Sequence, residues 1–242
     1  MKRMLKELLL RCVSLVLSDD RAKVVYYHDV GREYTPMGTP SDLFWRHMSI
    51  LRSCPASNGA HRVCFDDGFR GVWNERKKFK EFSIRPIIFI AVRLVGQSGY
   101  LTWDEIRELQ ADYGFDFQCH TWSHQTLVGE MIDESPKEDR TEAWYRRELV
   151  ESKVEIEKRL GKPIDGLCFP VGQFSDDVIR RCKEAGYSRL YASYPGNMPQ
   201  ESTGLIVPRN LVQGSSEVEF KAILKGALLP LKSHYLKRHY YA

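Results

Sequence analysis

The sequence contains the stretch Arg62-Val63-Cys64-Phe65-Asp66-Asp67-Gly68, a short apolar run that ends in two acidic residues and a glycine. A run that is apolar on both faces predicts a β-strand covered on both sides, as in a parallel sheet. Because neighbouring strand residues point to opposite faces, Asp66 and Asp67 can enter one site only where the strand stops and turns. Gly68 permits such a turn, although Asp-Gly is also a common turn dipeptide without further function.

Similar β-rich runs recur along the chain and alternate with helical patterns. The expected strands are residues 24–28, 62–67, 86–92, 115–120, 166–171, 189–194 and 206–212. The expected helices are residues 41–52, 72–82, 103–112, 142–160, 176–185 and 217–227. This alternation indicates parallel strands joined by right-handed crossovers, in an incomplete barrel or an open doubly wound sheet. In both architectures ligands bind at the carboxyl ends of the strands.

Composition excludes several classes of protein. The chain has 242 residues, of which 43% are hydrophobic, enough for one globular domain with its own core. No apolar run approaches the roughly 18 residues of a membrane-spanning helix. The net charge of +4 is too small to indicate a nucleic-acid partner. Composition does not predict an oligomeric state.

The two ends of the chain differ from the middle. Residues 1–23 hold six basic and three acidic side chains, and residues 221–242 hold five basic and no acidic ones. We therefore divide the chain into a basic, apolar N-terminal helix (1–23), one domain (24–224) and a basic, aromatic C-terminal tail (225–242). Packed terminal helices with solvated lysines explain this pattern, and so does peripheral contact with an anionic membrane surface.

The sequence predicts a cytoplasmic location, with contact to the membrane periphery as the alternative. Glu7 and Arg11 interrupt the first apolar run, unlike a secretory signal peptide. The six cysteines include no Cys-x-x-Cys pair, and at this chain length a disulfide scaffold is not expected. We interpret them as reduced thiols, with Cys64, Cys119 and Cys168 filling tight space in the core and pointing away from the site.

The second polar cluster is His120-Thr121-Trp122-Ser123-His124. Two histidines four residues apart would lie on one face of a helical turn and could chelate one cation. A pair with this spacing is more often structural when it stands alone. Together with a carboxylate from another strand end it forms a three-ligand set with open positions, as in catalytic zinc sites.

These motifs resemble those of polysaccharide deacetylases, carbohydrate esterase family 4 with its NodB homology domain. Residues 64–68 are similar to the Thr-Phe-Asp-Asp-Gly motif of that family, and residues 120–124 to its His-Ser/Thr-x-x-His motif. Other similar segments follow in the same order: 27–28, 101–106, 169–172, 184–187 and 207–209. The motifs are closest to those of poly-N-acetylglucosamine deacetylase-like members. The resemblance covers about residues 24–224 and implies an α/β fold, a distorted, incomplete (β/α)7 TIM-like barrel in a single domain.

The resemblance also implies a reaction and its residues. The chain would be a metal-dependent hydrolase that removes acetyl groups from an N-acetylated polysaccharide, oligosaccharide or glycan precursor by means of metal-activated water. Asp66 matches the catalytic base, and Asp67, His120 and His124 match the ligands of a divalent ion, Zn²⁺ with Co²⁺ or Ni²⁺ as alternatives. The backbone N–H at Val171 matches the oxyanion donor.

Two positions depart from the family pattern. Cys168 stands where many members have an arginine that holds the catalytic aspartate, and Arg209 is a candidate substitute. The late Leu-x-His motif is replaced by a segment ending in Gln213, whose amide cannot act as an acid, so we assign the general acid to His28.

The expected substrate-binding residues are Trp122, Phe169, Pro170 and Arg209. The alternatives are an O-acetyl esterase or non-sugar amidase of the same family, and a catalytically weak carbohydrate-binding or scaffold protein.

Overall fold

The computed structural model describes residues 2–16, 18–129, 139–199 and 205–241. Seven parallel strands form a closed barrel, because the last strand pairs with the first. In order they are β1 (Val24–Tyr27), β2 (Arg62–Phe65), β3 (Ile87–Ile90), β4 (Asp116–Cys119), β5 (Gly166–Cys168), β7 (Arg189–Ala192) and β8 (Ile206–Leu211). All seven predicted strands are confirmed, and the β1–β8 ladder selects the single-domain barrel over the open doubly wound sheet. The barrel has one strand fewer than a TIM barrel.

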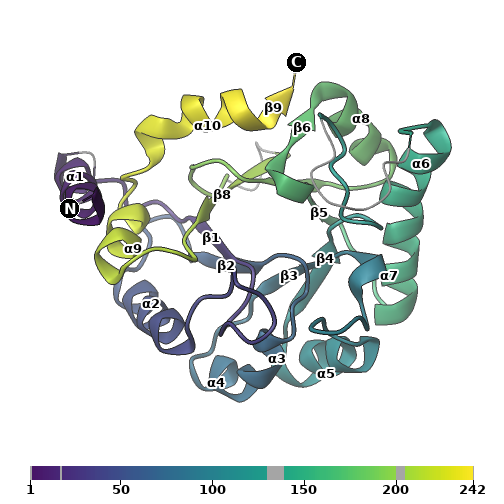
Figure 1. Cartoon of the computed structure of the whole chain (residues 1–242), viewed down its shortest axis with the longest axis horizontal. Helices are drawn as coiled ribbons and strands as arrows, with labels where there is room; N and C mark the ends of the chain where they lie inside the picture. Colours follow the sequence, from purple (N-terminus) through teal and green to yellow (C-terminus); the bar gives the residue numbers. More distant parts are fainter. Residues whose placement is uncertain (1, 17, 130–138, 200–204, 242) are drawn as a thin grey trace.

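Helices surround the barrel (Figure 1). They are α2 (Ser41–Ser53), α3 (Gly71–Asn74), α4 (Arg76–Glu81), α5 (Trp103–Tyr113), α6 (Glu142–Arg146), α7 (Ser152–Leu160), α8 (Asp176–Glu184) and α9 (Glu217–Leu224). The single helix predicted over 72–82 is split into α3 and α4. The helix predicted over 142–160 is continuous, but its middle turn, η2 (Arg147–Glu151), is a π-helix. Two short 3-10 turns, η1 (Val92–Leu94) and η3 (Pro170–Gly172), follow β3 and β5.

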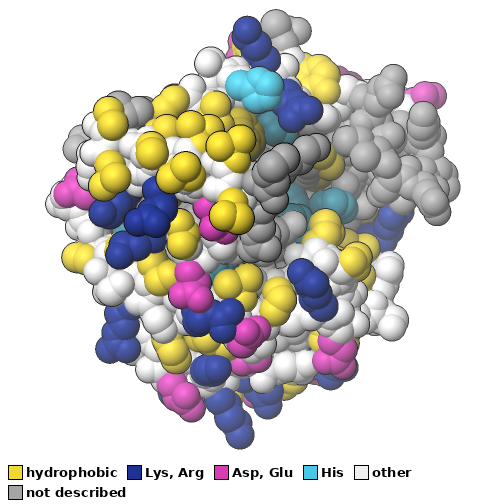
Figure 2. All heavy atoms as spheres, turned by 60° about the vertical axis from the view of Figure 1, so that its left-hand side comes forward, with side chains coloured by type: hydrophobic (Ala, Val, Ile, Leu, Met, Phe, Trp, Pro, Cys, Tyr) yellow, Lys and Arg dark blue, Asp and Glu magenta, His cyan; other side chains and the backbone are white. Residues whose placement is uncertain are grey.

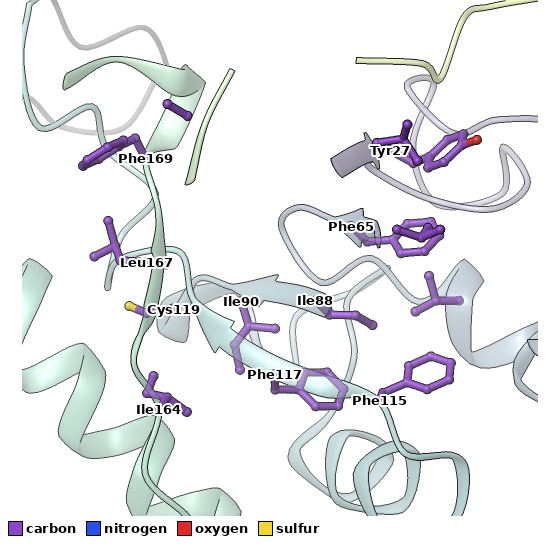
Figure 3. Close-up of a cluster of buried hydrophobic side chains, with 14 of the residues drawn as sticks. Tyr27, Phe65, Ile88, Ile90, Phe115, Phe117, Cys119, Ile164, Leu167 and Phe169 are labelled. Atoms are coloured by element: carbon purple, nitrogen blue, oxygen red, sulfur yellow. The ribbon is translucent and has the colours of Figure 1, made fainter. Parts of the chain in front are cut away.

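Alternate strand residues build two separate apolar layers, as the period of two requires. Tyr26, Cys64 and Phe89 belong to a small cluster of residues inside the barrel. Phe65 and Ile88 belong to the larger layer between the strands and the helices, which Figure 3 shows in close-up. Since both faces of the strands are buried, the ends of the strands are where polar side chains can reach solvent.

The first and last helices of the chain both lie on the outside of the barrel (Figure 1). Helix α1 (Lys2–Val16) packs against α9. After α9 the chain continues through η4 (Leu229–Leu231) and α10 (Lys232–His239) to β9 (Tyr240–Tyr241), which pairs with β6 (Phe174–Ser175). The sequence analysis predicted neither of these two-residue strands. Within the described ranges, no helix has the length and apolar character needed to cross a membrane.

Candidate active site

The polar residues from the sequence motifs meet at the rim formed by the carboxyl ends of the strands. His28 follows β1, Asp66 and Asp67 follow β2, His120 follows β4, and Val171 follows β5. All five line one pocket of about 360 Å³. Its other lining residues are Tyr26, Met37, His124, Gly172, Ser193, Pro195, Arg209, Leu211, Leu228, Tyr235 and His239.

The chain turns directly after β2, as the two adjacent aspartates require. Asp67 has φ 69° and Gly68 has φ 79°, so both lie in the left-handed region. For a non-glycine residue this conformation is uncommon and costs free energy that the surroundings must supply. A Cβ atom on Gly68 would lie 3.0 Å from the Ile90 Cγ2 atom. The turn therefore brings both carboxylates into one pocket and leaves room for little beyond glycine at the third position.

The histidine motif adopts a different conformation from the expected one. Residues 120–124 contain no helical turn, because Thr121 and His124 have φ 67° and 66°. The expectation that helical spacing brings the two histidines together is therefore wrong. They meet because the loop folds back on itself, and their ring centroids lie 4.8 Å apart.

Glu148, on the π-helical turn η2, holds this loop in place. Its Oε2 atom accepts hydrogen bonds from the backbone N–H groups of Trp122 and Ser123, at 3.0 and 2.8 Å. The carboxylate is fully buried and also contacts Arg147. A π-helical turn inside an α-helix often marks a functional site. Sequence reasoning missed Glu148. It lies 25 residues from Ser123, and no local sequence pattern indicates a contact between the two.

Asp67, His120 and His124 could hold a metal ion. One potential ligand atom from each lies within 4.8 Å of the other two. The Asp67 Oδ1 atom is 3.0 Å from His124 Nε2 and 3.5 Å from His120 Nε2. The structure brings together the three ligands that the resemblance implied.

The protonation of His120 supports a cation at this position. Its Nδ1 atom lies 2.8 Å from the backbone carbonyl oxygen of Cys168, so Nδ1 must carry the hydrogen. In a neutral ring Nε2 then presents a lone pair toward the carboxylate of Asp67. The Asp67 Oδ1 atom is itself buried, and among the described residues it has no hydrogen bond of good geometry. A divalent ion would satisfy all of these lone pairs, and one carboxylate with two imidazoles is a donor set typical of catalytic zinc.

The carboxylate of Asp67 is held in its charged form. Burial by itself raises its pKa, but the neighbouring His124 and His120 outweigh burial and bring the pKa well below the ordinary value. A carboxylate ligand must be deprotonated to bind a metal. Asp67 is therefore in the charged form that a cation requires.

Asp66 is paired with Arg209 from β8. The guanidinium Nη1 lies 2.5 Å from Oδ1 and Nη2 lies 2.9 Å from Oδ2, a bidentate arrangement. Arg209 is fully buried, and its guanidinium carbon sits 4.3 Å from the ring centroid of Tyr26. Burial alone raises the pKa of Asp66, but the charge of Arg209 outweighs it, and the pKa lies below its ordinary value. Asp66 is thus ionised and fixed in orientation.

Cys168 points toward this ion pair, so the expectation that its side chain turns away from the site is wrong. Its Sγ atom lies 2.9 Å from Nη2 of Arg209. With Asp66 and His120 it forms a second group of potential ligand atoms within 4.8 Å. Burial raises the pKa of this thiol well above its ordinary value, and Asp66 is already engaged by Arg209. The group around Asp67 is therefore the better metal site.

His28 lines the same pocket, directly after β1. Its Nδ1 atom lies 2.5 Å from the side-chain oxygen of Gln213. Because an amide oxygen can only accept, His28 donates from Nδ1, and Nε2 is left as the atom that can exchange a proton in the pocket. Gln213 stands where the Leu-x-His motif of the family has its histidine. Here its side chain orients His28, the candidate general acid.

Val171 belongs to a second strained turn. It has φ 56° and is followed by Gly172 with φ 73°. Its side chain is 43% exposed in the pocket. Left-handed backbone is found here, at Asp67 and in the histidine loop, and such strain concentrates at functional sites.

The C-terminal segment forms part of the pocket wall, which the sequence analysis did not foresee. Leu228, Tyr235 and His239 all line the pocket. Burial lowers the pKa of His239, and its ring interacts with the backbone of Val171. Helical periodicity in α10 cannot reveal this role, since it depends on the return of β9 to pair with β6.

Three predicted substrate-binding residues are not among those that line the pocket. Phe169 is fully buried and stacks on Phe174, with 5.2 Å between ring centroids. Pro170 is also buried, and neither side chain is among those that line the pocket. Trp122 is half-buried in the histidine loop outside this pocket. Arg209 does line the pocket, as the partner of Asp66.

Comparison with known proteins gives a consistent result. A family model described as polysaccharide deacetylase matches residues 56–190, more than half of the chain. A curated relative, "Putative polysaccharide deacetylase YxkH" of Bacillus subtilis strain 168, is 22% identical over 135 residues, which are 55% of this chain and 44% of the relative. The chain thus spans less than half the length of that relative.

Solved structures share the fold. IcaB from Ammonifex degensii superposes with a TM-score of 0.73 at 18% identity, covering 86% of this chain and 99% of that one. Deacetylase PplD of Streptococcus pyogenes gives 0.70 at 17% identity, covering 84% and 98%. A polysaccharide deacetylase from Bacillus cereus gives 0.68 at 21% identity, covering 85% and 69%.

Proposed function

Because the chain belongs to the polysaccharide deacetylase family, we propose that it is a metal-dependent hydrolase that removes acetyl groups from N-acetylated carbohydrate. The observation that carries this proposal is the joint geometry of two sets. The group of Asp67, His120 and His124 lies in one pocket beside the carboxylate of Asp66, which Arg209 holds ionised. The first set suits a divalent cation, and the second suits a base.

Asp67, His120 and His124 would hold the ion, with Zn²⁺ as the first candidate and Co²⁺ or Ni²⁺ as alternatives. A divalent ion in such a site supplies Lewis-acid polarisation of an acetyl carbonyl and lowers the pKa of a water molecule. The three protein ligands leave positions open for both. His120 is kept in the correct orientation by the carbonyl of Cys168.

Asp66 would accept the proton from the attacking water. A general base must be unprotonated when the reaction starts, and the ion pair with Arg209 ensures this. As the oxygen of the water bonds to the acetyl carbon, its proton passes to Asp66. The backbone N–H of Val171 would donate to the oxygen that becomes negative in this step.

His28 would complete the reaction by protonating the leaving amine. When the bond between the acetyl carbon and the sugar nitrogen breaks, that nitrogen needs a proton to leave as an amine. The Nε2 atom of His28 can give it, because Nδ1 is occupied by Gln213. The products are a free amino sugar and acetic acid, which releases its proton to become acetate. Asp66 then gives its proton up and His28 takes one up, so both side chains return to their starting forms.

Acetate release tests the proposed function. The purified chain is incubated with N-acetylglucosamine oligomers and, separately, with an acetylated xylan, each with added Zn²⁺ and with a chelator. We expect chelator-sensitive release from the N-acetylated substrate, lost in Asp66→Asn and kept in the control Asp112→Asn, which changes an exposed aspartate on α5. Release from xylan alone would replace the amidase with an O-acetyl esterase. Substrate binding without release from either would favour a carbohydrate-binding or scaffold protein.

A further inference from the structure

Helix α1 has two apolar faces, one buried and one exposed. On the buried face, Leu10 packs with Ala222 and Ala227. The exposed side chains, which we call the α1 face, are 59% to 82% accessible: Met4, Leu5, Leu8, Leu9, Leu15 and Val16. Figure 2 shows hydrophobic side chains gathered on the side of the molecule where Figure 1 places α1, with lysine and arginine side chains next to them. Scattered exposed leucines need no explanation, but a continuous group on one helix indicates an interaction site.

A basic depression adjoins the α1 face. Arg11, Lys221 and Lys225 line a hollow of about 370 Å³ between α1 and α9, together with Ser14, Leu15, Val218 and Ala222. The lining contains no carboxylate, and within the described part of the chain none of the three cations takes part in an ion pair with an acidic side chain. Leu15 belongs to both the α1 face and this hollow. Three cations without an acidic partner among the described residues, at the border of an apolar stripe, suit the phosphates of anionic lipid headgroups.

Helix α1 is connected to the candidate active site through its buried side. Val13 of α1 and Leu228 each pack against the cluster of Leu10, Ala222 and Ala227. Leu228 in turn lines the pocket that holds the site. The buried side of α1 and one wall of the pocket thus share an apolar cluster.

We propose that the α1 face and the basic depression dock this chain on the surface of an anionic phospholipid bilayer. The apolar side chains would enter the interface between headgroups and acyl chains, while Arg11, Lys221 and Lys225 contact the phosphates. This docking is independent of the reaction proposed above, since none of these residues belongs to the candidate site.

A second copy of the chain fits this surface less well. In a two-fold dimer the same patch meets itself, so the three cations of one copy would approach the three of the other without a carboxylate between them. Lysine is also depleted at protein–protein interfaces, whereas it is favoured beside the apolar face of interfacial helices.

Vesicle flotation with the full chain tests the proposal. The probes are vesicles of phosphatidylcholine with and without phosphatidylglycerol, at low and high salt. We expect binding to the anionic vesicles that weakens as salt rises. Removing the charges in Arg11→Ala/Lys221→Ala/Lys225→Ala should weaken it on the order of a hundredfold at low salt. Leu8→Gln/Leu15→Gln should weaken it at least about tenfold at either salt concentration.

Matched variants serve as controls on other surfaces. Lys77→Ala/Lys158→Ala/Lys183→Ala removes the same charge from exposed positions elsewhere, and Val150→Gln/Val154→Gln removes exposed apolar groups from η2 and α7. Both should bind vesicles like the unmodified chain. Equal binding to neutral and anionic vesicles, or no binding, overturns the proposal. A dimer in light scattering that becomes a monomer in Leu8→Gln/Leu15→Gln, without any vesicle binding, overturns it in favour of self-association.

Discussion

The guanidinium of Arg209 binds both carboxylate oxygens of Asp66, at 2.5 and 2.9 Å, across 143 residues of sequence. Both side chains are buried, and the Sγ atom of Cys168 contacts the guanidinium of Arg209. Removal of one partner from a buried ion pair leaves an uncompensated charge. The pair therefore controls both the protonation of the candidate base and the stability of the barrel rim.

Arg209→Gln should shift the acid limb of the pH profile of kcat/KM upward. Without the guanidinium, burial raises the pKa of Asp66, so the base is protonated at a higher pH and activity is lost earlier as pH falls. The expected shift is about one pH unit or more, measured as acetate release against pH. Arg209→Lys, which keeps the charge, should shift the acid limb less. It provides a second test of the charge if Arg209→Gln fails to fold.

Arg189→Gln is the matched control for this measurement. Arg189 forms an exposed ion pair with Asp165 at the start of β7, at the opposite end of the barrel. Its profile should coincide with that of the unmodified chain. An unchanged acid limb in Arg209→Gln would show that Asp66 is not the base.

His28→Gln should lower kcat by about 10² to 10⁴, the usual contribution of a positioned general acid. The variant lacks the proton that the leaving amine requires. Gln213→Leu should have a smaller effect on kcat, because His28 loses the partner that orients its ring through Nδ1. His61→Gln, at a half-buried histidine bonded to the backbone of Cys54, is the control. Full turnover in His28→Gln would assign the acid to another group.

Glu148→Gln should weaken metal binding about tenfold, within the range known for groups that orient metal ligands. The amide keeps a single accepting oxygen and no charge, so the backbone N–H groups of Trp122 and Ser123 hold the histidine loop less firmly. Titration calorimetry with Zn²⁺ measures the change. Glu151→Gln alters an exposed residue of the same π-helical turn and should leave affinity unchanged. Equal affinities in both variants would limit Glu148 to a role in stability.

His47 should make the chain less stable in acid. Its buried ring stacks on Phe220 at 4.2 Å, and burial lowers its pKa to about 4. The neutral ring is the buried form, so the stability that it contributes is complete above pH 6.5 and is lost as pH falls through 4. That loss corresponds to about 3 kcal/mol.

Urea unfolding at several pH values measures this effect against His47→Gln, which does not titrate. The difference in the free energy of unfolding between the two chains should shrink by about 3 kcal/mol from pH 6.5 to 4. A constant difference across this range would mean that the ring is already protonated when buried, or that the unfolded chain shares its pKa.

Sequence periodicity predicted the barrel because its strands are buried on both faces and therefore read as apolar runs. The same reasoning failed for β6 and β9, which have two residues each and no period. It also failed at His124, where left-handed backbone occurs without a glycine or asparagine to signal it.

The candidate site was predictable where its polar residues directly follow an apolar strand in the sequence, as Asp66 and Asp67 do. Arg209 could be proposed only as a substitute, since its contact with Asp66 depends on barrel closure between β1 and β8. Glu148 and His239 act through tertiary contacts that no local pattern encodes.

Calorimetric titration of Zn²⁺ into the metal-free chain, Asp66→Asn and Asp67→Asn tests the central claim most directly. The account predicts one ion per chain, nearly unchanged affinity in Asp66→Asn, and affinity at least about a hundredfold weaker in Asp67→Asn, which loses a charged ligand. The reverse order, with binding lost in Asp66→Asn and kept in Asp67→Asn, would place the ion between Asp66, His120 and Cys168 and contradict the assignment of base and ligand.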